Sequence, residues 1–189
     1  MTTSTNKPIN PTINPNDIND SNDKDANETK PSFRPMARMK QSLSEEEISR
    51  VLDKEKRGVL CVHGENGYPY GIPMNFWYDK LTGRIYFHSG KKGHKVDAIR
   101  ANSKACFCVY DTGYRRENEW ALNVSSVIIF GQISPLEVED RAIEIYRQLS
   151  HKFTSDDAYI ESEISKFAKS TLCYELIPEH VSGKLVNEA

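Results

Sequence analysis

The chain has 189 residues and a mass of 21.6 kDa, which suits one domain of ordinary size and is too short for two large ones. Its 25 basic and 27 acidic residues give a formal net charge of −2, which argues against a domain that binds nucleic acid through bulk positive charge. No apolar run approaches the roughly 20 residues of a membrane span, and no secretory signal is readable at the N-terminus. We therefore expect a cytoplasmic globular protein that binds neither nucleic acid nor membrane.

The first part of the chain differs in composition from the rest. Residues 1–31 contain seven asparagines and four prolines, but very few apolar side chains. So little apolar surface cannot offset the roughly 1–2 kcal/mol per residue that ordering the backbone costs. We expect residues 1–35 to be a disordered tail and residues 36–189 to form the folded domain.

The folded part is predicted to begin with a helix and continue with strands. Ser44 and Glu47 match a capping box, in which Ser44 is the N-cap and Glu47 the third helical residue. Short apolar or alternating runs then predict strands at Gly58–His63, Gly71–Tyr78, Arg84–Ser89, Ala105–Asp111, Val124–Gln132 and Leu172–Ile177, the last one stopped by Pro178. Helical spacing predicts a short helix at His94–Ala101 and two more, one from Val138 to Phe153 and one from Ile160 to Ala168. The pattern indicates an α+β, mainly β fold built around a small antiparallel barrel.

The segment from Arg84 to Lys104 carries the strongest chemical signal. It holds six Lys or Arg residues and one acid, Asp97, in a chain that is otherwise acidic. A strand ending in Ser89 leads into a loop with two glycines, and a helix opens with His94 and Lys95. Glycines, helix N–H groups and cations together are typical of a phosphate site. The alternative is a solvated basic turn.

Five segments in this order resemble one known family: Gly58–Leu60, Gly67–Asn75, Ile85–Ser89, Gly93–Ile99 and Ser126–Gly131. They resemble the FMN-binding split-barrel family related to pyridoxamine 5′-phosphate oxidase, and within it the nitroimidazole-resistance (Nim-type) branch. The resemblance covers about residues 38–185. It implies a six-stranded antiparallel split β-barrel with flanking helices, which forms a homodimer and binds FMN at the subunit interface.

The resemblance also implies which residues contact FMN. The phosphate would be held by the turn and helix after the third strand: Ser89, His94 and Lys95, with Lys91 or Lys92 as helpers. The isoalloxazine edge would meet the second strand at Pro73, Met74, Asn75 and Phe76. The other subunit would contribute Ser125 and Ser126. The typical oxidase has Arg-Lys where this chain has His94-Lys95, and its substrate-binding Arg and His pattern is not found in residues 181–185.

His88 is the candidate catalytic or substrate-contacting residue. In the expected strand it faces away from Ile85 and Phe87, directly before the phosphate loop, and Nim-type proteins have a histidine beside the flavin at this motif. The alternative is a histidine hydrogen-bonded at the barrel rim. We expect no metal site, because Cys106 and Cys108 alone make a poor zinc site and are more typical of buried packing.

Two aromatic residues, Trp77 and Trp120, could flank a planar ligand or serve in the core or an interface. The leading functional hypothesis is an FMN-dependent oxidoreductase that reduces a small aromatic, nitroimidazole-like substrate, with NAD(P)H as a candidate electron donor. The alternative is a non-catalytic flavin- or haem-binding protein of the same fold, serving storage or sensing.

Overall fold

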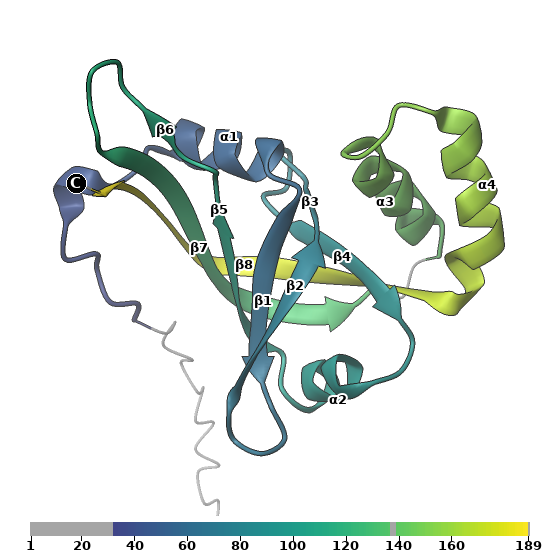
Figure 1. Cartoon of the computed structure of the whole chain (residues 1–189). Helices are drawn as coiled ribbons and strands as arrows, with labels where there is room; N and C mark the ends of the chain where they lie inside the picture. The colour runs from purple at the N-terminus through teal and green to yellow at the C-terminus, as the bar shows by residue number, and fades with distance from the viewer. Residues whose placement is uncertain (1–31, 137–138, 189) are drawn as a thin grey trace, which may run out of the picture. The chain divides into compact units, whose positions relative to one another are not determined.

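Eight β-strands form one antiparallel sheet in the computed structural model, which describes residues 32–136 and 139–188 (Figure 1). Their order across the sheet is β2-β1-β5-β7-β8-β4-β3, and β6 pairs with β7. The strands are β1 Arg57–His63, β2 Pro69–Asn75, β3 Trp77–Tyr78, β4 Ile85–Gly90, β5 Lys104–Tyr110, β6 Tyr114–Arg115, β7 Leu122–Pro135 and β8 Thr171–Glu188. The six longer strands correspond to the six expected ones, so the mainly β fold class is confirmed.

The sheet curls, and its two edge strands, β2 and β3, follow one another in the sequence. β2 pairs with β1 at one edge, β3 pairs with β4 at the other, and only Phe76 lies between β2 and β3. The expected strand Gly71–Tyr78 is therefore wrong as one continuous element. Its alternation continues through Phe76, but the chain changes hydrogen-bonding partner there, which periodicity does not record.

The last strand also differs from its prediction, because Pro178 does not stop it. β8 continues to Glu188, paired with β7 from Tyr174 onward. A register shift places Gly131 opposite Pro178 and Phe130 opposite His180, so Glu179 is the extra residue of a bulge. The pairing of β8 with β4 ends at Leu176, so Pro178 lies where β8 has β7 as its one paired neighbour. A residue without an N–H is tolerated at such a position.

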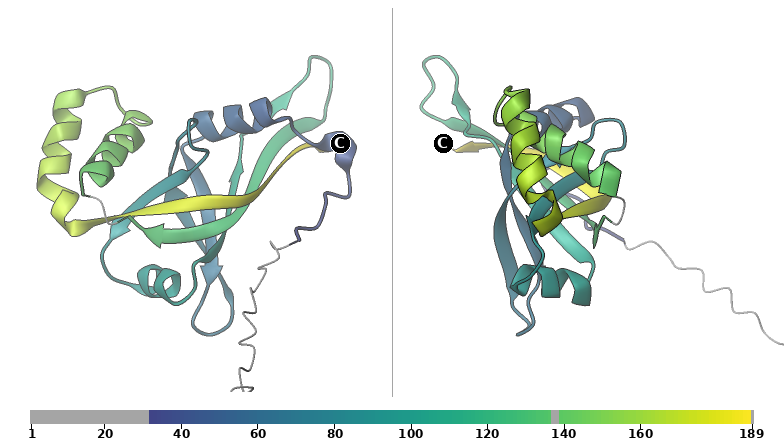
Figure 2. Two further views of the ribbon diagram at one scale, coloured as in Figure 1. Left: turned by 180° about the vertical axis from the view of Figure 1, so that it is seen from behind. Right: turned by 90° about the vertical axis from the view of Figure 1, so that its right-hand side faces the viewer.

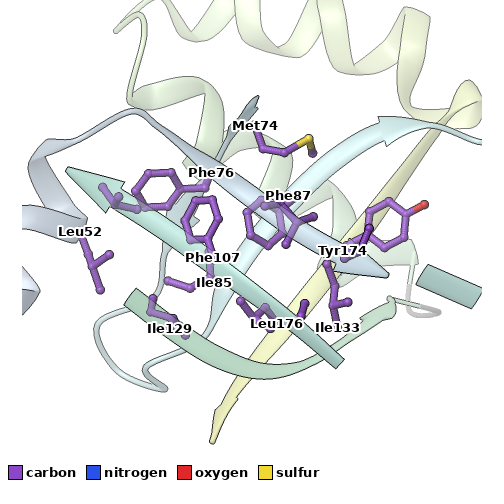
Figure 3. Packing of buried hydrophobic residues seen from close by; sticks show 14 of the residues in the cluster. Leu52, Met74, Phe76, Ile85, Phe87, Phe107, Ile129, Ile133, Tyr174 and Leu176 are labelled. Atoms are coloured by element: carbon purple, nitrogen blue, oxygen red, sulfur yellow. The ribbon is translucent and has the colours of Figure 1, made fainter. Parts of the chain in front are cut away.

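The interior of the curled sheet is filled by large apolar side chains (Figure 3). The ring of Phe107 on β5 meets Phe76 at 5.0 Å and Phe87 at 4.9 Å between centroids, both edge to face. Other fully buried members of this core are Leu60, Ile85, Ile129, Ile133, Tyr174 and Leu176. On β4 the alternation holds as predicted, since Ile85 and Phe87 point into this core.

Four α-helices flank the sheet in the described ranges: α1 Glu45–Lys54, α2 His94–Ala101, α3 Glu139–His151 and α4 Asp157–Phe167. The capping box of α1 is confirmed, because Ser44 Oγ accepts from the Glu47 N–H and Glu47 Oε2 accepts from the Ser44 N–H at 2.8 Å. α3 and α4 lie together beside β4 and the start of β8 (Figure 2). Val138, the first residue of the expected third helix, lies outside the described residues.

A polar network attaches α3 to the sheet. Arg141 Nη2 donates to Asp79 Oδ2 at 3.2 Å, and the Tyr86 hydroxyl donates to Glu175 at 2.8 Å. Burial alone would raise the pKa of Asp79, but hydrogen bonds from Thr82 and Leu81 and the charge of Arg141 hold that pKa below its ordinary value. Asp79 is therefore ionised at neutral pH and anchors the helix that covers β4.

The other end of α3 contacts the end of α1. Lys152, just after α3, donates from Nζ to the carbonyl oxygens of Leu52 (3.1 Å) and Glu55, and its ammonium lies 4.1 Å from the centre of the Phe76 ring. A cation at the C-terminus of a helix interacts favourably with the helix dipole. Burial lowers the pKa of Lys152 to about 8.

The described chain already makes a contact at Phe33, three residues before the expected start of the domain. The Phe33 ring stacks on His180 at 4.7 Å and on Phe130 at 5.6 Å. The expected disorder of residues 1–31 lies outside the described residues. Among the helices that the structure does describe, none is both long and apolar enough to cross a membrane.

Candidate functional site

Helix α2 begins with backbone groups that face outward from the protein. Gly93 is its N-cap, with φ of +118°, and no side chain within the described ranges caps the helix. A Cβ built on Gly90 or Gly93 would meet nothing in the structure within 4 Å, so the space over this loop is open. The first N–H groups of the helix can therefore donate to an anion from outside the chain.

Among the basic side chains near the start of α2, Lys95 has the surroundings that best suit an anion-binding group. Its side chain is partly buried, and Nζ donates to Met74 Sδ at 3.3 Å. Burial lowers its pKa, and among the described residues no carboxylate forms a salt bridge with it. A partly desolvated charge without a counter-ion is unfavourable. A phosphate at the start of α2 would supply the missing counter-charge.

The residues expected to contact the isoalloxazine ring, on β2 and just after it, have different surroundings. Met74 is buried and joins β2 to α2 through its contact with Lys95. Phe76 is fully buried in the core, so only its backbone can meet a ligand. Pro73 is exposed, and Asn75 Oδ1 accepts a hydrogen bond from Arg57 Nε at 3.0 Å.

His88 lies on the outer side of β4, facing α3, as the alternation of the strand predicts. Its Nδ1 is buried and has no hydrogen-bond partner in the described part of the chain. Burial lowers the pKa of His88, and the nearby charge of Lys95 lowers it further. Since the ordinary value is about 6.5, the imidazole is neutral at pH 7. A neutral imidazole nitrogen without a partner can bind a ligand group.

Beside His88 is a cavity of about 290 Å³ between β4, α3 and α4. Its lining combines rings and aliphatic groups with a carboxylate and three hydroxyls: His88, Tyr146, Ser150, Glu163, Ile164, Phe167, Ala168 and Thr171. The Tyr146 ring stands edge-on to His88 at 6.2 Å, and burial, followed by Cys173, raises the pKa of Tyr146 to about 12. The tyrosine is therefore protonated and can donate a hydrogen bond.

Sequence reasoning missed every contribution of α3 and α4 to this cavity. In the sequence, Tyr146 shares the apolar face of the expected helix from Val138 to Phe153 with Ala142 and Ile145, which is typical of core packing. Those two do pack on the sheet, while Tyr146, at the edge of that face, reaches His88. A phenol at the border of an otherwise aliphatic stripe was the available signal.

Several expected site residues lie apart from Lys95 and His88. Lys104, which follows α2, pairs with Gln132 on β7. Ser126 lies six residues before Gln132 on the same strand, which puts it about 20 Å from Gln132 at 3.3 Å per residue. Ser125 is next to it and donates its N–H to Asp111. One subunit therefore does not bring these serines to α2.

The remaining loop candidates have other neighbours. His94 stacks on Tyr70 at 4.3 Å, so its ring covers the β1–β2 hairpin. Lys91 lines a separate cavity with Lys169. Lys92 is exposed and Ser89 Oγ donates to the carbonyl of Gly90.

The remaining candidates, Cys106, Cys108 and Trp77, contact other side chains of the sheet. Cys106 and Cys108 lie with Cys61 on the outer face of β1 and β5, and burial, then Cys61 and Cys108, raises the pKa of Cys106 to about 11. Within residues 32–136 and 139–188 no group of three or more His, Cys, Asp or Glu side chains is arranged to hold a metal ion. Trp77 packs on Tyr86 at 5.4 Å.

Comparison with solved structures identifies similar folds. The chain is similar to a candidate 5-nitroimidazole antibiotic resistance protein from Bacteroides thetaiotaomicron, with 16% identity and a TM-score of 0.66 over 77% of this chain and 87% of that one. It is similar to an FAD-binding protein from Mesorhizobium loti (20% identity, TM-score 0.58, 77% and 97% covered). It is also similar to an FAD and haem binding protein from Mycobacterium smegmatis, with 20% identity and a TM-score of 0.62 over 77% of this chain and 73% of that one.

Comparison with sequences places the chain more narrowly. No curated protein matches it at a significant level. The family model for pyridoxamine 5′-phosphate oxidase matches residues 44–185, which span all four helices, the Ser44 cap of the first included, and the sheet apart from the last three residues of β8. With the curled sheet and the shared fold of the solved structures, this match shows that the chain belongs to the pyridoxamine 5′-phosphate oxidase family.

Proposed function

We propose that the protein is an FMN-binding oxidoreductase that acts as a homodimer. The observation that carries the proposal is the combination of Lys95, partly buried and without a carboxylate partner, with the open N-terminus of α2. That arrangement fits the phosphate of a flavin mononucleotide. Structures similar to this one include FAD-binding proteins from M. loti and M. smegmatis, which supports a flavin as the ligand class.

Bound flavin would supply the electron transfer, and the residues of this chain would bind and orient. Lys95 and the first N–H groups of α2 would hold the phosphate, and Met74 would fix the Lys95 side chain. His88, neutral at pH 7, lines the cavity and would contact the substrate with its imidazole. Tyr146 would donate from its hydroxyl on the other side of the cavity.

The cavity supports a small aromatic substrate. A volume of about 290 Å³ accommodates a substituted five- or six-membered ring. The rings of Tyr146 and Phe167 can pack on a planar molecule, and the polar atoms of His88 can orient it. We propose a nitroimidazole-like compound as the substrate and NAD(P)H as the electron donor. The similar structure from B. thetaiotaomicron supports this substrate class.

The homodimer is supported by the outer face of β5 and β7. Tyr110, Ile128 and Phe130 share that face, by register, with Cys106 and Cys108, and all three are exposed. Apolar side chains gathered on one sheet face are typical of a protein contact. A two-fold partner would also explain how Ser125 and Ser126, remote from α2 in their own subunit, reach a flavin.

A second candidate is a haem- or flavin-binding protein without turnover. The observation in its favour is again His88, because its neutral imidazole lines a cavity and an imidazole is the usual axial ligand of haem iron. The M. smegmatis protein similar in fold binds both FAD and haem.

Purified protein separates these candidates. Chromatography of the released cofactor identifies FMN, FAD or haem, and we expect FMN. Under anaerobic conditions NAD(P)H should bleach the flavin spectrum, and a nitroimidazole should restore it. His88→Ala should retain FMN and lose the recovery step, while the exposed control Lys104→Ala keeps both. A haem spectrum, or flavin that no donor or substrate affects, would refute the reductase.

A further inference from the structure

A second cavity, of about 430 Å³, adjoins the cavity beside His88. The two cavities share three lining residues, Tyr146, Ala168 and Thr171, so they meet along one wall. Both lie where α3 is set against β4 (Figure 1). Together the two cavities can therefore hold one molecule that is longer than a single ring.

The second cavity differs from the first in its charge. Lys91 from the β4–α2 loop and Lys169, two residues before β8, both line it, together with Glu139 of α3. Two lysines and one glutamate give this lining a formal charge of +1. Among the described residues no carboxylate forms a salt bridge with either lysine, whereas Glu163 of the first cavity is paired with Lys166 at 3.0 Å. The unbalanced positive charge therefore belongs to the second cavity.

The register of β4 and β8 places the two lysines at the same end of this strand pair. Gly90 is opposite Thr171. Lys91 follows Gly90 directly, and Lys169 is two residues before Thr171. From His88 to Gly90 the strand advances roughly 7 Å, at about 3.3 Å per residue. A group held between the lysines would therefore be separated from the imidazole by about the length of a short substituent.

A carboxylate fits this lining better than a phosphate group does. A carboxylate balances the formal charge of +1, whereas a phosphate monoester carries about two negative charges at pH 7. The Thr171 hydroxyl in the shared wall already donates to the carbonyl of Phe167 at 2.8 Å. The ammonium groups of the two lysines are thus the donors that a carboxylate would meet, in charge-assisted hydrogen bonds.

We infer that the two cavities together bind an aromatic substrate whose ring carries a short chain ending in a carboxylate. The ring would lie beside His88 in the first cavity, and the carboxylate between Lys91 and Lys169 in the second. The inference rests on the proposed function, and it narrows the substrate class from small aromatic compounds to aromatic acids.

The test compares two nitroimidazoles, one whose ring nitrogen carries a propanoate chain and the corresponding uncharged propanamide. Calorimetric titrations use full-length protein saturated with oxidised FMN, so that no turnover occurs. The wild type should bind the propanoate at least about tenfold more tightly than the propanamide. Lys91→Gln and Lys169→Gln should each weaken propanoate binding about three- to tenfold, and the double variant should bind both compounds equally. Propanamide binding should change less than about twofold in all three variants.

Lys104→Gln is the matched control, because it removes the same charge from an exposed side chain at the start of β5. Both affinities should stay within about twofold of the wild type. Salt gives a second readout. Raising its concentration should weaken the binding of the propanoate and leave that of the propanamide unchanged, because screening acts on the charged group.

Equal affinities of the wild type for the two compounds, with both of them reduced, would overturn the inference while the reductase stands. A loss of FMN affinity in Lys91→Gln with unchanged propanoate binding would assign that lysine to the flavin phosphate, which also contradicts the inference. A protein that contains no flavin, or that reduces neither compound with NAD(P)H, would instead refute the proposed function, and the inference with it.

Discussion

Replacing Lys95 by methionine should separate the binding of the phosphate from the stability of the fold. The change removes the ammonium but keeps an unbranched apolar stem of similar length beside Met74. In the ligand-free protein Lys95 is a partly buried cation whose pKa burial lowers, and it has no carboxylate partner in the described residues. Its removal should therefore leave the melting temperature unchanged or slightly higher.

The effect on FMN should have the opposite sign. A charge-assisted hydrogen bond to a phosphate is worth roughly 1.5–3 kcal/mol, which corresponds to about a 10- to 100-fold weaker FMN affinity. Riboflavin has the same ring and no phosphate, so its affinity should change by less than about threefold. Titration of both ligands, followed by flavin fluorescence, measures the two constants directly.

Lys104→Met is the control, because Lys104 is exposed and follows α2, outside the β4–α2 loop. It should bind both ligands as the wild type does. If Lys95→Met also bound both as the wild type does, the β4–α2 loop would be a solvated basic turn and the phosphate site would be refuted. Equal losses for FMN and riboflavin would place Lys95 at the ring, which also contradicts the assignment.

Three further predictions concern stability. Between pH 8 and 10.5 the unfolded chain holds a proton that folded Lys152 has lost. The free energy of unfolding of the wild type relative to Lys152→Met, measured by urea titration, should therefore rise with pH across this window, by about 2–3 kcal/mol. Asp79 has a lowered pKa, so its contribution should be present at neutral pH and lost on acidification through its folded pKa; Asp79→Asn should show a smaller acid-induced drop in melting temperature. Deleting residues 1–31 should leave the melting temperature unchanged, whereas deleting 1–35 should lower it by about 2–4 °C, because the Phe33 stack is lost.

Local sequence signals were sufficient to predict the starts of α1 and α2 and the side-chain alternation of β4, the strand that carries His88. The Ser44–Glu47 capping box and the glycine before His94 placed the starts of α1 and α2, because capping depends on residues within one turn. The alternation of β4 predicted that His88 faces away from the core. These features depend on backbone geometry over a few residues, which the sequence records directly.

Features that depend on a distant partner were not predictable. The division of β2 from β3 at Phe76 and the passage of β8 through Pro178 follow from which strand each segment pairs with. Neither hydrophobic period nor proline content records the partner. The same is true of the Phe76 side chain, which lies in the core and leaves only the backbone of this residue to meet a ligand.

The sequence by itself determined the fold class, the glycine-capped start of α2 and the outward orientation of His88, because periods, caps and glycines act within a few residues. Only the tertiary structure decided what meets that histidine. The cavity exists because Arg141 and Asp79 attach α3 over β4, which brings Tyr146 to His88 across 58 residues of chain. Such a meeting depends on how a helix is set against a sheet, and that setting is the sum of many distant contacts rather than a pattern in any one segment.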